Sequence, residues 1–307
     1  MKTWHYALIV FLGGCCLGIL STFVKLAYAA GYSMGEVTGS QVLVGTIIIW
    51  IVTFFIRKKK FDFNQTLKLV SAGIPMGLTG LLYYQSLQTL EASLAIICLF
   101  QFIWIGTLIE WIYYRRKPSL NKVISIVILL SGSVLAAGLF GGSLDSISWQ
   151  GALWGMLSAF TFSIFIFLSG IIGNDIPAVQ KSALLSTGAL LVTFIFFPPV
   201  FLADFTTVIG VAPYGLILGI FGVVLPPLLF SIGMPHVGPG LGTILTASEL
   251  PVAIILSAVV LSEYISMSQW TGVGLILCGI IFGNIGSMQA GAIMETHGKK
   301  ETDEIVY

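Results

Sequence analysis

Residues 91–135 read EASLAIICLFQFIWIGTLIEWIYYRRKPSLNKVISIVILLSGSVL. Two long apolar runs flank the short basic connection RRKPS at 115–119. A helix needs about 20 apolar residues to cross the hydrocarbon core of a bilayer, and each run reaches that length, the second by continuing to residue 140. This stretch therefore predicts an all-helical membrane protein in which short connections join successive spans.

The composition of the whole chain agrees with a membrane protein. Of its 307 residues, 57% are hydrophobic and 9% are charged, whereas soluble domains carry about 25% charged residues. A soluble fold is excluded. The apolar runs predict ten transmembrane helices, at 5–29, 37–56, 67–87, 92–113, 120–140, 149–171, 180–202, 213–233, 239–262 and 268–288. Too few residues remain for a soluble catalytic domain, and we expect the polar tail at 289–307 in the cytoplasm.

The basic residues predict the orientation in the membrane. If the N-terminus is cytoplasmic, all Lys and Arg residues except Lys25 fall at the cytoplasmic side: Lys2, Arg57, Lys58, Lys59, Lys60, Lys68, Arg115, Arg116, Lys117, Lys122, Lys181, Lys299 and Lys300. The positive-inside rule therefore places both termini in the cytoplasm. Acidic residues mark the outward loops, at Glu36, Glu91, Asp145, Asp204 and Glu263. The net charge of +1 gives no reason to expect a nucleic acid as a partner.

The chain also contains an internal repeat. Residues 91–135 align without a gap with residues 238–282, at a constant offset of 147, so that Leu94 pairs with Leu241 and Gly132 with Gly279. Five spans per half put the copies in opposite orientations, which predicts two inverted five-helix repeats at 1–145 and 146–288. Such repeats let a transporter alternate between inward-open and outward-open states around a site near the bilayer midplane. An inert bundle left by an old duplication is the alternative.

Two stretches resemble a known family: LYYQSLQTLEASLAIICLFQF at 82–102 and ASELPVAIILSAVVLSEYISMSQWTGVGLILCGI at 247–280. They are similar to EamA-type members of the drug/metabolite transporter superfamily. In that family each half ends with a connection resembling L-G-E and a Gly-rich helix. Leu261, Ser262 and Glu263 match it with Ser in place of Gly, whereas the first half has YYRRKPS there. The resemblance implies a transporter fold and role, but the family moves chemically diverse solutes.

Three ionisable residues lie within the predicted spans: Lys25, Glu110 and Glu249. A charge at a helix centre costs at least about 2.5 to 3.5 kcal/mol on insertion scales, so such residues commonly mark solute or ion pathways. Glu249 lies nearest the midplane and is the strongest site candidate, with Gly242 and Thr246 expected on its helix face. A buried carboxylate can exchange a proton, which suits proton coupling. A structural hydrogen bond to another helix is the alternative.

Lys25 belongs to a stripe of small and polar residues at helical spacing that includes Gly14, Gly18 and Ser21. Such a stripe is expected to face protein or water. Lys25 and Glu249 together suggest one zwitterionic or amino-acid-like solute, whose carboxylate and amine they would attract. The alternative for Lys25 is a long side chain that reaches the outer interface without touching solute.

Polar and aromatic residues in the fourth span supply further candidates. Gln101 is nearer the midplane than Glu110, and the repeat alignment pairs it with Ser248. Glu110 lies near the basic connection, where an interfacial ion pair is expected. Trp104 follows Gln101 by one helical turn and could stack on a solute or fill the bundle.

Prolines within spans point to the same central region. Pro75 interrupts the third span, and Pro226 and Pro227 interrupt its counterpart, the eighth. Paired interruptions in two halves indicate a transporter binding site. On the third span the face of Pro75 carries Thr79 and Tyr83, which we therefore expect to line the site.

The leading interpretation is a secondary transporter or facilitator that exports a small polar metabolite, multi-pass in a bacterial cytoplasmic membrane. The sequence has no phosphate-binding loop, metal-ligand cluster or nucleophile motif, so we expect no cofactor, no metal and no enzymatic activity. A membrane-embedded enzyme and a structural membrane protein without transport are the alternatives.

Cysteine labelling tests the predicted orientation. In a variant without native cysteines, a single cysteine at Ser146 should react with an impermeant reagent added outside, whereas one at Asn64 should not, because the basic residues hold the latter side in the cytoplasm. Strong outside labelling at position 64 would falsify both the orientation and the inverted repeat.

Overall fold

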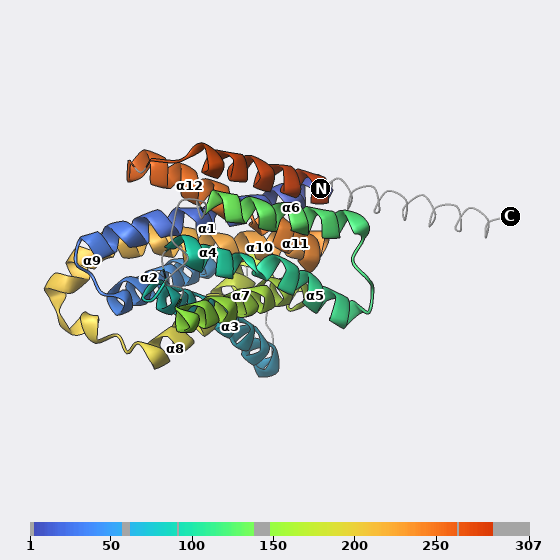
Figure 1. Ribbon diagram of the computed structural model, residues 1–307. Coiled ribbons are helices and arrows are strands. Elements are labelled where there is room, and N and C mark those ends of the chain that lie inside the picture. The colour runs from blue at the N-terminus through green and yellow to red at the C-terminus, as the bar shows by residue number, and fades with distance from the viewer. Residues whose placement is uncertain (1–2, 57–61, 91, 138–147, 263, 285–307) are drawn as a thin grey trace.

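The computed structural model describes residues 3–56, 62–90, 92–137, 148–262 and 264–284. Over these residues the chain is helical without β-strands, and most of its helices lie side by side along one direction (Figure 1). The predictions that concern Lys2, residues 57–60, Glu91, Asp145, Glu263 and the tail at 289–307 fall outside this part of the chain.

The helices follow one another along the chain with short connections. In the first half they are α1 (Thr3–Ala29), α2 (Met34–Phe54), α3 (Phe63–Leu87), α4 (Ala92–Phe100), α5 (Phe102–Tyr114) and α6 (Leu120–Ala136). The second half contains α7 (Trp149–Ile171), α8 (Ala178–Phe196), a 3-10 turn (Val200–Ala203), α9 (Phe205–Leu218), a π-helical segment (Gly219–Val224), α10 (Leu225–Val237), α11 (Pro239–Thr246), α12 (Glu249–Val260) and a helix over 267–284.

The helix lengths confirm a multi-pass membrane protein. Within the described residues, seven helical stretches are long and apolar enough to cross a membrane: Trp4–Ala29, Met34–Phe54, Ala95–Tyr114, Trp149–Ile171, Ala178–Phe196, Phe205–Val237 and Pro239–Val260. A shorter apolar helix covers Leu120–Ala136. The stretch Phe205–Val237 begins well before the predicted boundary at 213, because the side chain of Asp204 accepts hydrogen bonds from the backbone N–H groups of Thr206 and Thr207 and so starts α9 there.

Two predicted spans are broken in the middle. The backbone N–H of Gln101 donates to the carbonyl of Cys98 (3.3 Å), because the side-chain amide of Gln101 donates to the Ile97 carbonyl (3.0 Å) that the backbone would otherwise use. In the second break Pro251 has no N–H to donate to the carbonyl of Ala247. The helix face predicted to carry both Thr246 and Glu249 is therefore interrupted by the second break.

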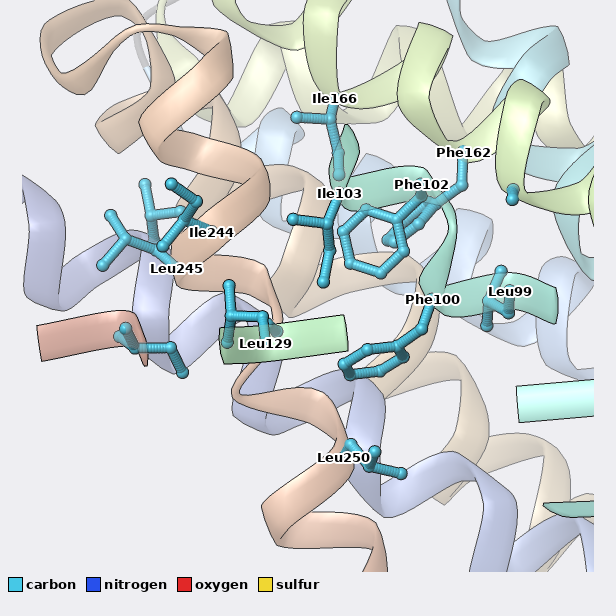
Figure 2. Close-up of a cluster of buried hydrophobic side chains, with 14 of the residues drawn as sticks. Leu99, Phe100, Phe102, Ile103, Leu129, Phe162, Ile166, Ile244, Leu245 and Leu250 are labelled. Atoms are coloured by element: carbon cyan, nitrogen blue, oxygen red, sulfur yellow. The ribbon is translucent and has the colours of Figure 1, made fainter. Parts of the chain in front are cut away.

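The main apolar core surrounds these two breaks. Figure 2 shows Phe100 and Phe102 on either side of the first break, with Leu250 and the pair Ile244 and Leu245 from the segments that flank the second. All five side chains are buried. The core thus holds the irregular backbone of both halves inside protein, away from lipid.

Local features recur at positions 147 residues apart. Arg115 and Ser262 are the two described residues other than glycine with positive φ, at 56° and 53°. Packing recurs as well, since a β-carbon on Gly132 would lie 2.9 Å from the Ile276 side chain and one on Gly279 would lie 2.9 Å from the Leu129 side chain. The offset of 147 converts one contact into the other, so that α6 and the helix over 267–284 exchange roles.

Close backbone approach joins α3 to α8. A β-carbon on Gly73 would collide with the backbone carbonyl of Leu185, and one on Gly188 would collide with that of Val70. A β-carbon on Gly80, also in α3, would meet no atom within 4 Å. The two helices can therefore approach this closely only because Gly73 and Gly188 lack side chains.

Substitution at Gly73 should weaken this contact. We expect Gly73→Ala to destabilise the protein by about 1 to 3 kcal/mol, because a backbone carbonyl cannot move aside as a flexible side chain can. Gly80→Ala is the matched control and should be neutral or stabilising. Thermal unfolding of purified protein in detergent measures both, and equal midpoints for the two variants would contradict the proposed close packing.

Candidate functional site

A cavity of about 600 Å³ lies between helices of both halves of the chain. Its walls come from α1, α2 and α3 on one side of the sequence and from α8, α10 and α12 on the other, with additional side chains from α4, α6 and α7. Of the predicted site residues, it is lined by Lys25, Thr79, Tyr83 and Glu249. The structure thus brings together residues that are far apart in the sequence.

Glu249 is placed in the wall by the second helix break. It is the first residue of α12, and Gly18 of α1 lies directly against its backbone carbonyl. The preceding residue, Ser248, fixes the break to α1 by donating a hydrogen bond to the carbonyl of Phe11 (2.8 Å). The carboxylate oxygen Oε2 of Glu249 is buried without a hydrogen-bond partner among the described residues. The carboxylate is therefore held at the cavity but left without a hydrogen bond to that oxygen.

Lys25 lines the same cavity and is itself exposed. It lies about two helical turns beyond Gly18, which corresponds to about 10 Å along the axis of α1. Since Gly18 packs against Glu249, the two ionisable residues lie at different levels of the cavity.

Thr79 and Tyr83 form part of the α3 wall. The hydroxyl of Thr79 donates to the carbonyl of Pro75 (2.7 Å) and lies 3.0 Å from the hydroxyl of Thr161 in α7. Tyr83 packs beside Tyr84, with their ring centroids 6.1 Å apart. This wall combines aromatic surface with hydroxyl groups, as a site for a small polar solute requires.

The other four predicted site residues do not line the cavity. Gln101 accepts a hydrogen bond from the indole of Trp104 (2.7 Å), and this Trp is 38% exposed. Thr246 is fully buried and donates to the carbonyl of Gly242 (2.8 Å), while Ser248 bonds to α1. The helix face predicted for Glu249 does not extend to Thr246, because the helix is interrupted between these two residues.

Four buried neutral residues of the cavity wall with hydrogen-bonding side chains were not among the predicted site residues: Thr22, Thr38, Gln41 and Thr193. All are buried, and an oxygen of each side chain lacks a hydrogen-bond partner within the described part of the chain. The sequence signal for these residues is the presence of polar residues within apolar runs. This signal is weak evidence for a site, because a threonine in a helix commonly bonds to its own backbone.

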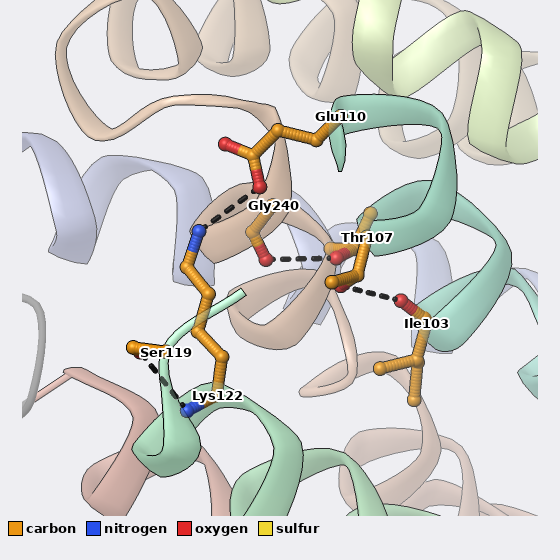
Figure 3. A network of polar contacts seen from close by, with 7 residues as sticks. Ile103, Thr107, Glu110, Ser119, Lys122 and Gly240 are labelled. Carbon is orange, nitrogen blue, oxygen red and sulfur yellow. Dashed lines mark hydrogen bonds and ion pairs between the residues drawn. The ribbon is translucent and has the colours of Figure 1, made fainter. Parts of the chain in front are cut away.

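An ion pair lies away from the cavity, at the far end of α5. Figure 3 shows the ammonium of Lys122 on α6 and the carboxylate of Glu110, which are 2.9 Å apart. The carboxylate lies against Gly240 at the start of α11, where a β-carbon would collide with it. The expected ion pair of Glu110 is therefore present, and its partner is Lys122. The pair connects α5, α6 and α11.

Lys181 was counted among the cations at the cytoplasmic side, where an exposed side chain is expected, but its side chain is buried. Its side chain is 1% exposed, and its ammonium donates to the carbonyl of Ser169 (2.8 Å) and to the side-chain oxygen of Asn174 (3.1 Å). It thereby caps the C-terminal end of α7. This residue serves the α7–α8 connection and does not line the cavity.

The fold and the cavity together define a multi-pass helical membrane protein with an internal solute-sized chamber. The sequence matches the model of the EamA-like transporter family over residues 4–138 and 149–285, and the chain belongs to that family. This finding confirms the resemblance noted in the sequence.

Individual relatives carry transporter names. The "Uncharacterized transporter YcbK" of Bacillus subtilis (strain 168) is 23% identical over 302 residues, covering 94% of each chain. The "Threonine/homoserine exporter RhtA" of Salmonella typhimurium (strain SL1344) is 24% identical over 254 residues, covering 82% of this chain and 80% of that protein. A protein of known crystal structure has the same fold, with a TM-score of 0.68 at 16% identity over 90% of this chain and 98% of the other.

Proposed function

We propose that this chain is a secondary transporter that exports a small polar, amino-acid-like metabolite across a bacterial cytoplasmic membrane. The single observation that carries the proposal is the cavity of about 600 Å³, lined from both halves of the chain, with the Glu249 carboxylate in its wall. Membership in a transporter family supports the general role. The further details concern architecture, mechanism and solute.

We propose that ten spans form two inverted repeats, at 1–145 and 146–288. Equivalent helix breaks at Gln101 and Ser248 support this, as do equivalent N-terminal caps, in which the hydroxyls of Ser119 and Ser266 accept from the backbone N–H three residues later. Helix packing has the corresponding symmetry. The helix α1 packs on α10 and α12 of the second half, while α7, its counterpart, packs on α3 and α5 of the first.

Equivalent positions in the two halves have different surroundings, which supports transport by alternating access. Glu110 and Lys122 pair beside Gly240, whereas their counterparts at the offset of 147, Ser257 and Gln269, line the cavity. We infer that the structure is outward-open and that the ion pair helps to close the cytoplasmic side. In the opposite state the halves would exchange conformations, so that the outer side closes and the ion pair separates.

The chemistry of the wall favours an amine-bearing solute. The carboxylate of Glu249 attracts an ammonium group, and Lys25, about 10 Å farther along α1, attracts a carboxylate as a solute enters or leaves. Glu249 can take up a proton when the ammonium departs, which would couple transport to a proton gradient. The name of RhtA, a threonine/homoserine exporter, supports an amino acid as the solute class.

Neutralising Glu249 should impair transport without unfolding the protein. We expect Glu249→Gln to lower the rate of L-threonine movement into proteoliposomes by about tenfold or more, because a charge-assisted hydrogen bond contributes about 1.5 to 3 kcal/mol. Any dependence of that rate on a pH gradient should also disappear.

Glu36→Gln is the matched control for this change. Glu36 accepts a hydrogen bond from the backbone N–H of Ser33 in the cap of α2 (2.7 Å), and glutamine can keep that cap. Both variants should be purified in equal yield. Unchanged flux and unchanged pH response in Glu249→Gln would make Glu249 a structural residue.

The ion pair should bias the protein toward the outward-open state. In a variant with Ser257→Cys as the only cysteine, removal of either partner by Glu110→Gln or Lys122→Gln should slow labelling from outside by about two- to fivefold, as expected for a partly exposed pair. The double variant should label no more slowly than either single variant, because each single substitution already removes the one interaction between Glu110 and Lys122. Equal labelling rates in all four proteins would show that the pair does not set the conformational equilibrium.

A further inference from the structure

The four unpredicted polar residues of the cavity share one unusual property. Thr22, Thr38, Gln41 and Thr193 are only 1%, 3%, 7% and 0% exposed. The hydroxyl oxygens of the threonines and the Oε1 atom of Gln41 have no hydrogen-bond partner within the described residues. A buried polar group without a partner destabilises the folded state, so each such group in a native structure calls for an explanation, of which a functional role is one.

Other buried threonines in the same protein do not share this property. Thr53 donates to the carbonyl of Ile49 (2.6 Å), and Thr107 donates to that of Ile103 (3.1 Å), each within its own helix. Neither Thr53 nor Thr107 lines the cavity. Among the described threonines, those with an unbonded buried hydroxyl all line the cavity, whereas the buried serines Ser182 and Ser231 have unbonded hydroxyls away from it.

Packing contacts bring two of these residues to the same depth. The helices α2 and α8 run antiparallel, with Thr46 donating to the carbonyl of Ser186 (3.3 Å) at one level and Gly35 meeting the ring of Phe197 at another. Thr38 and Thr193 fall between these two levels on their respective helices. They consequently face the cavity from neighbouring helices at one height.

Gln41 and Thr22 lie close to that height. A β-carbon on Gly222 would meet both the amide nitrogen of Gln41 (2.6 Å) and the side chain of Leu20 (2.7 Å), so α1 and α2 meet there. Thr38 is about 4.5 Å from Gln41 along α2, and Thr22 is about 3 Å from Leu20 along α1, both toward the same end of the bundle. All four residues therefore lie within about one helical turn of depth.

We propose that Thr22, Thr38, Gln41 and Thr193 form a second subsite of the cavity, which binds an uncharged hydrogen-bonding group of the solute, such as a side-chain hydroxyl. This inference rests on the transport function proposed above and specifies the solute further. The four residues line the cavity, while their unbonded oxygen atoms are buried. Rotation of a threonine side chain by about 120° to another staggered rotamer exchanges the positions of its hydroxyl and methyl groups.

The chemistry of this subsite selects a neutral polar group. A hydroxyl can donate and accept, and the Oε1 atom of Gln41 accepts, so a solute hydroxyl can satisfy both kinds of group. None of the four side chains carries a charge that would compensate an ionic group. Thr22 lies about 6 Å, or one turn, from Gly18 along α1, and Gly18 packs against Glu249. A short amino acid can therefore place its ammonium at Glu249 and a side-chain hydroxyl at the subsite.

Threonine and valine are suitable probes, because they have nearly the same shape and differ by a hydroxyl in place of a methyl group. A site that forms hydrogen bonds to a solute hydroxyl discriminates strongly against the analogue without it. We expect wild-type protein in proteoliposomes to transport L-threonine with a KM about tenfold or more below that for L-valine. Thr38→Val and Thr193→Val should each reduce this ratio by about two- to tenfold through a higher KM for threonine.

Thermal unfolding of each purified variant in detergent checks that it is folded, and a KM for valine that changes less than the KM for threonine shows that the lost contact is to the solute hydroxyl. Thr38→Ser and Thr193→Ser retain a hydroxyl and should keep most of the preference for threonine. Thr53→Val is the matched control in α2, because its hydroxyl bonds within its own helix away from the cavity; this substitution should not alter the ratio.

The outcomes separate this inference from the function on which it rests. If wild-type protein moves neither amino acid, the proposed amino-acid transport fails and the subsite falls with it. If threonine and valine move with equal KM, or if the ratio is unchanged in Thr38→Val and Thr193→Val, the subsite is overturned while transport stands. A ratio that falls in the valine variants and persists in the serine variants supports the subsite.

Discussion

Backbone N–H and C=O groups inside a bilayer need hydrogen-bond partners within the protein, and this constraint governs the whole structure. Irregular backbone is therefore tolerated only where protein or a water-filled cavity surrounds it. The breaks at Gln101 and Ser248 meet this condition. They lie in the main core, and their own side chains provide bonds, from Gln101 to Ile97 and from Ser248 to Phe11. The second break also positions Glu249 at the cavity, so one local irregularity serves both stability and the site.

Satisfied and unsatisfied polar groups are distributed unevenly along the bundle. At the end near Gly240, the carboxylate of Glu110 is paired with Lys122. In the cavity, an oxygen of Glu249 and the hydroxyls of Thr38 and Thr193 lack partners in the described protein. Folding alone favours pairing of every buried group, so the unpaired groups that line the cavity support the proposal that it binds a solute.

Much of the fold could be predicted from the sequence, because span length and composition are strong signals in a bilayer. The site was predictable in part. Glu249 and Lys25 could be recognised by the cost of a charge, and Thr79 and Tyr83 by their place on the face of Pro75. Thr246 was expected at the cavity because a regular helix was extrapolated across a break that depends on Pro251. Thr38 and Thr193 escaped notice, since whether a threonine bonds to its own helix depends on its rotamer, which the sequence does not reveal.

The levels of the polar groups also constrain how one solute can use them. Glu249 lies near Gly18, Thr22 of the proposed second subsite lies about one turn farther along α1, and Lys25 lies about another turn beyond. In the proposed mechanism an amino acid places its ammonium at Glu249, and Lys25, which is exposed, acts at another stage of the passage. Within the proposed mechanism, the lysine affects how fast a zwitterion enters or leaves, while Glu249 and the hydroxyls determine which solute is held when the cavity closes.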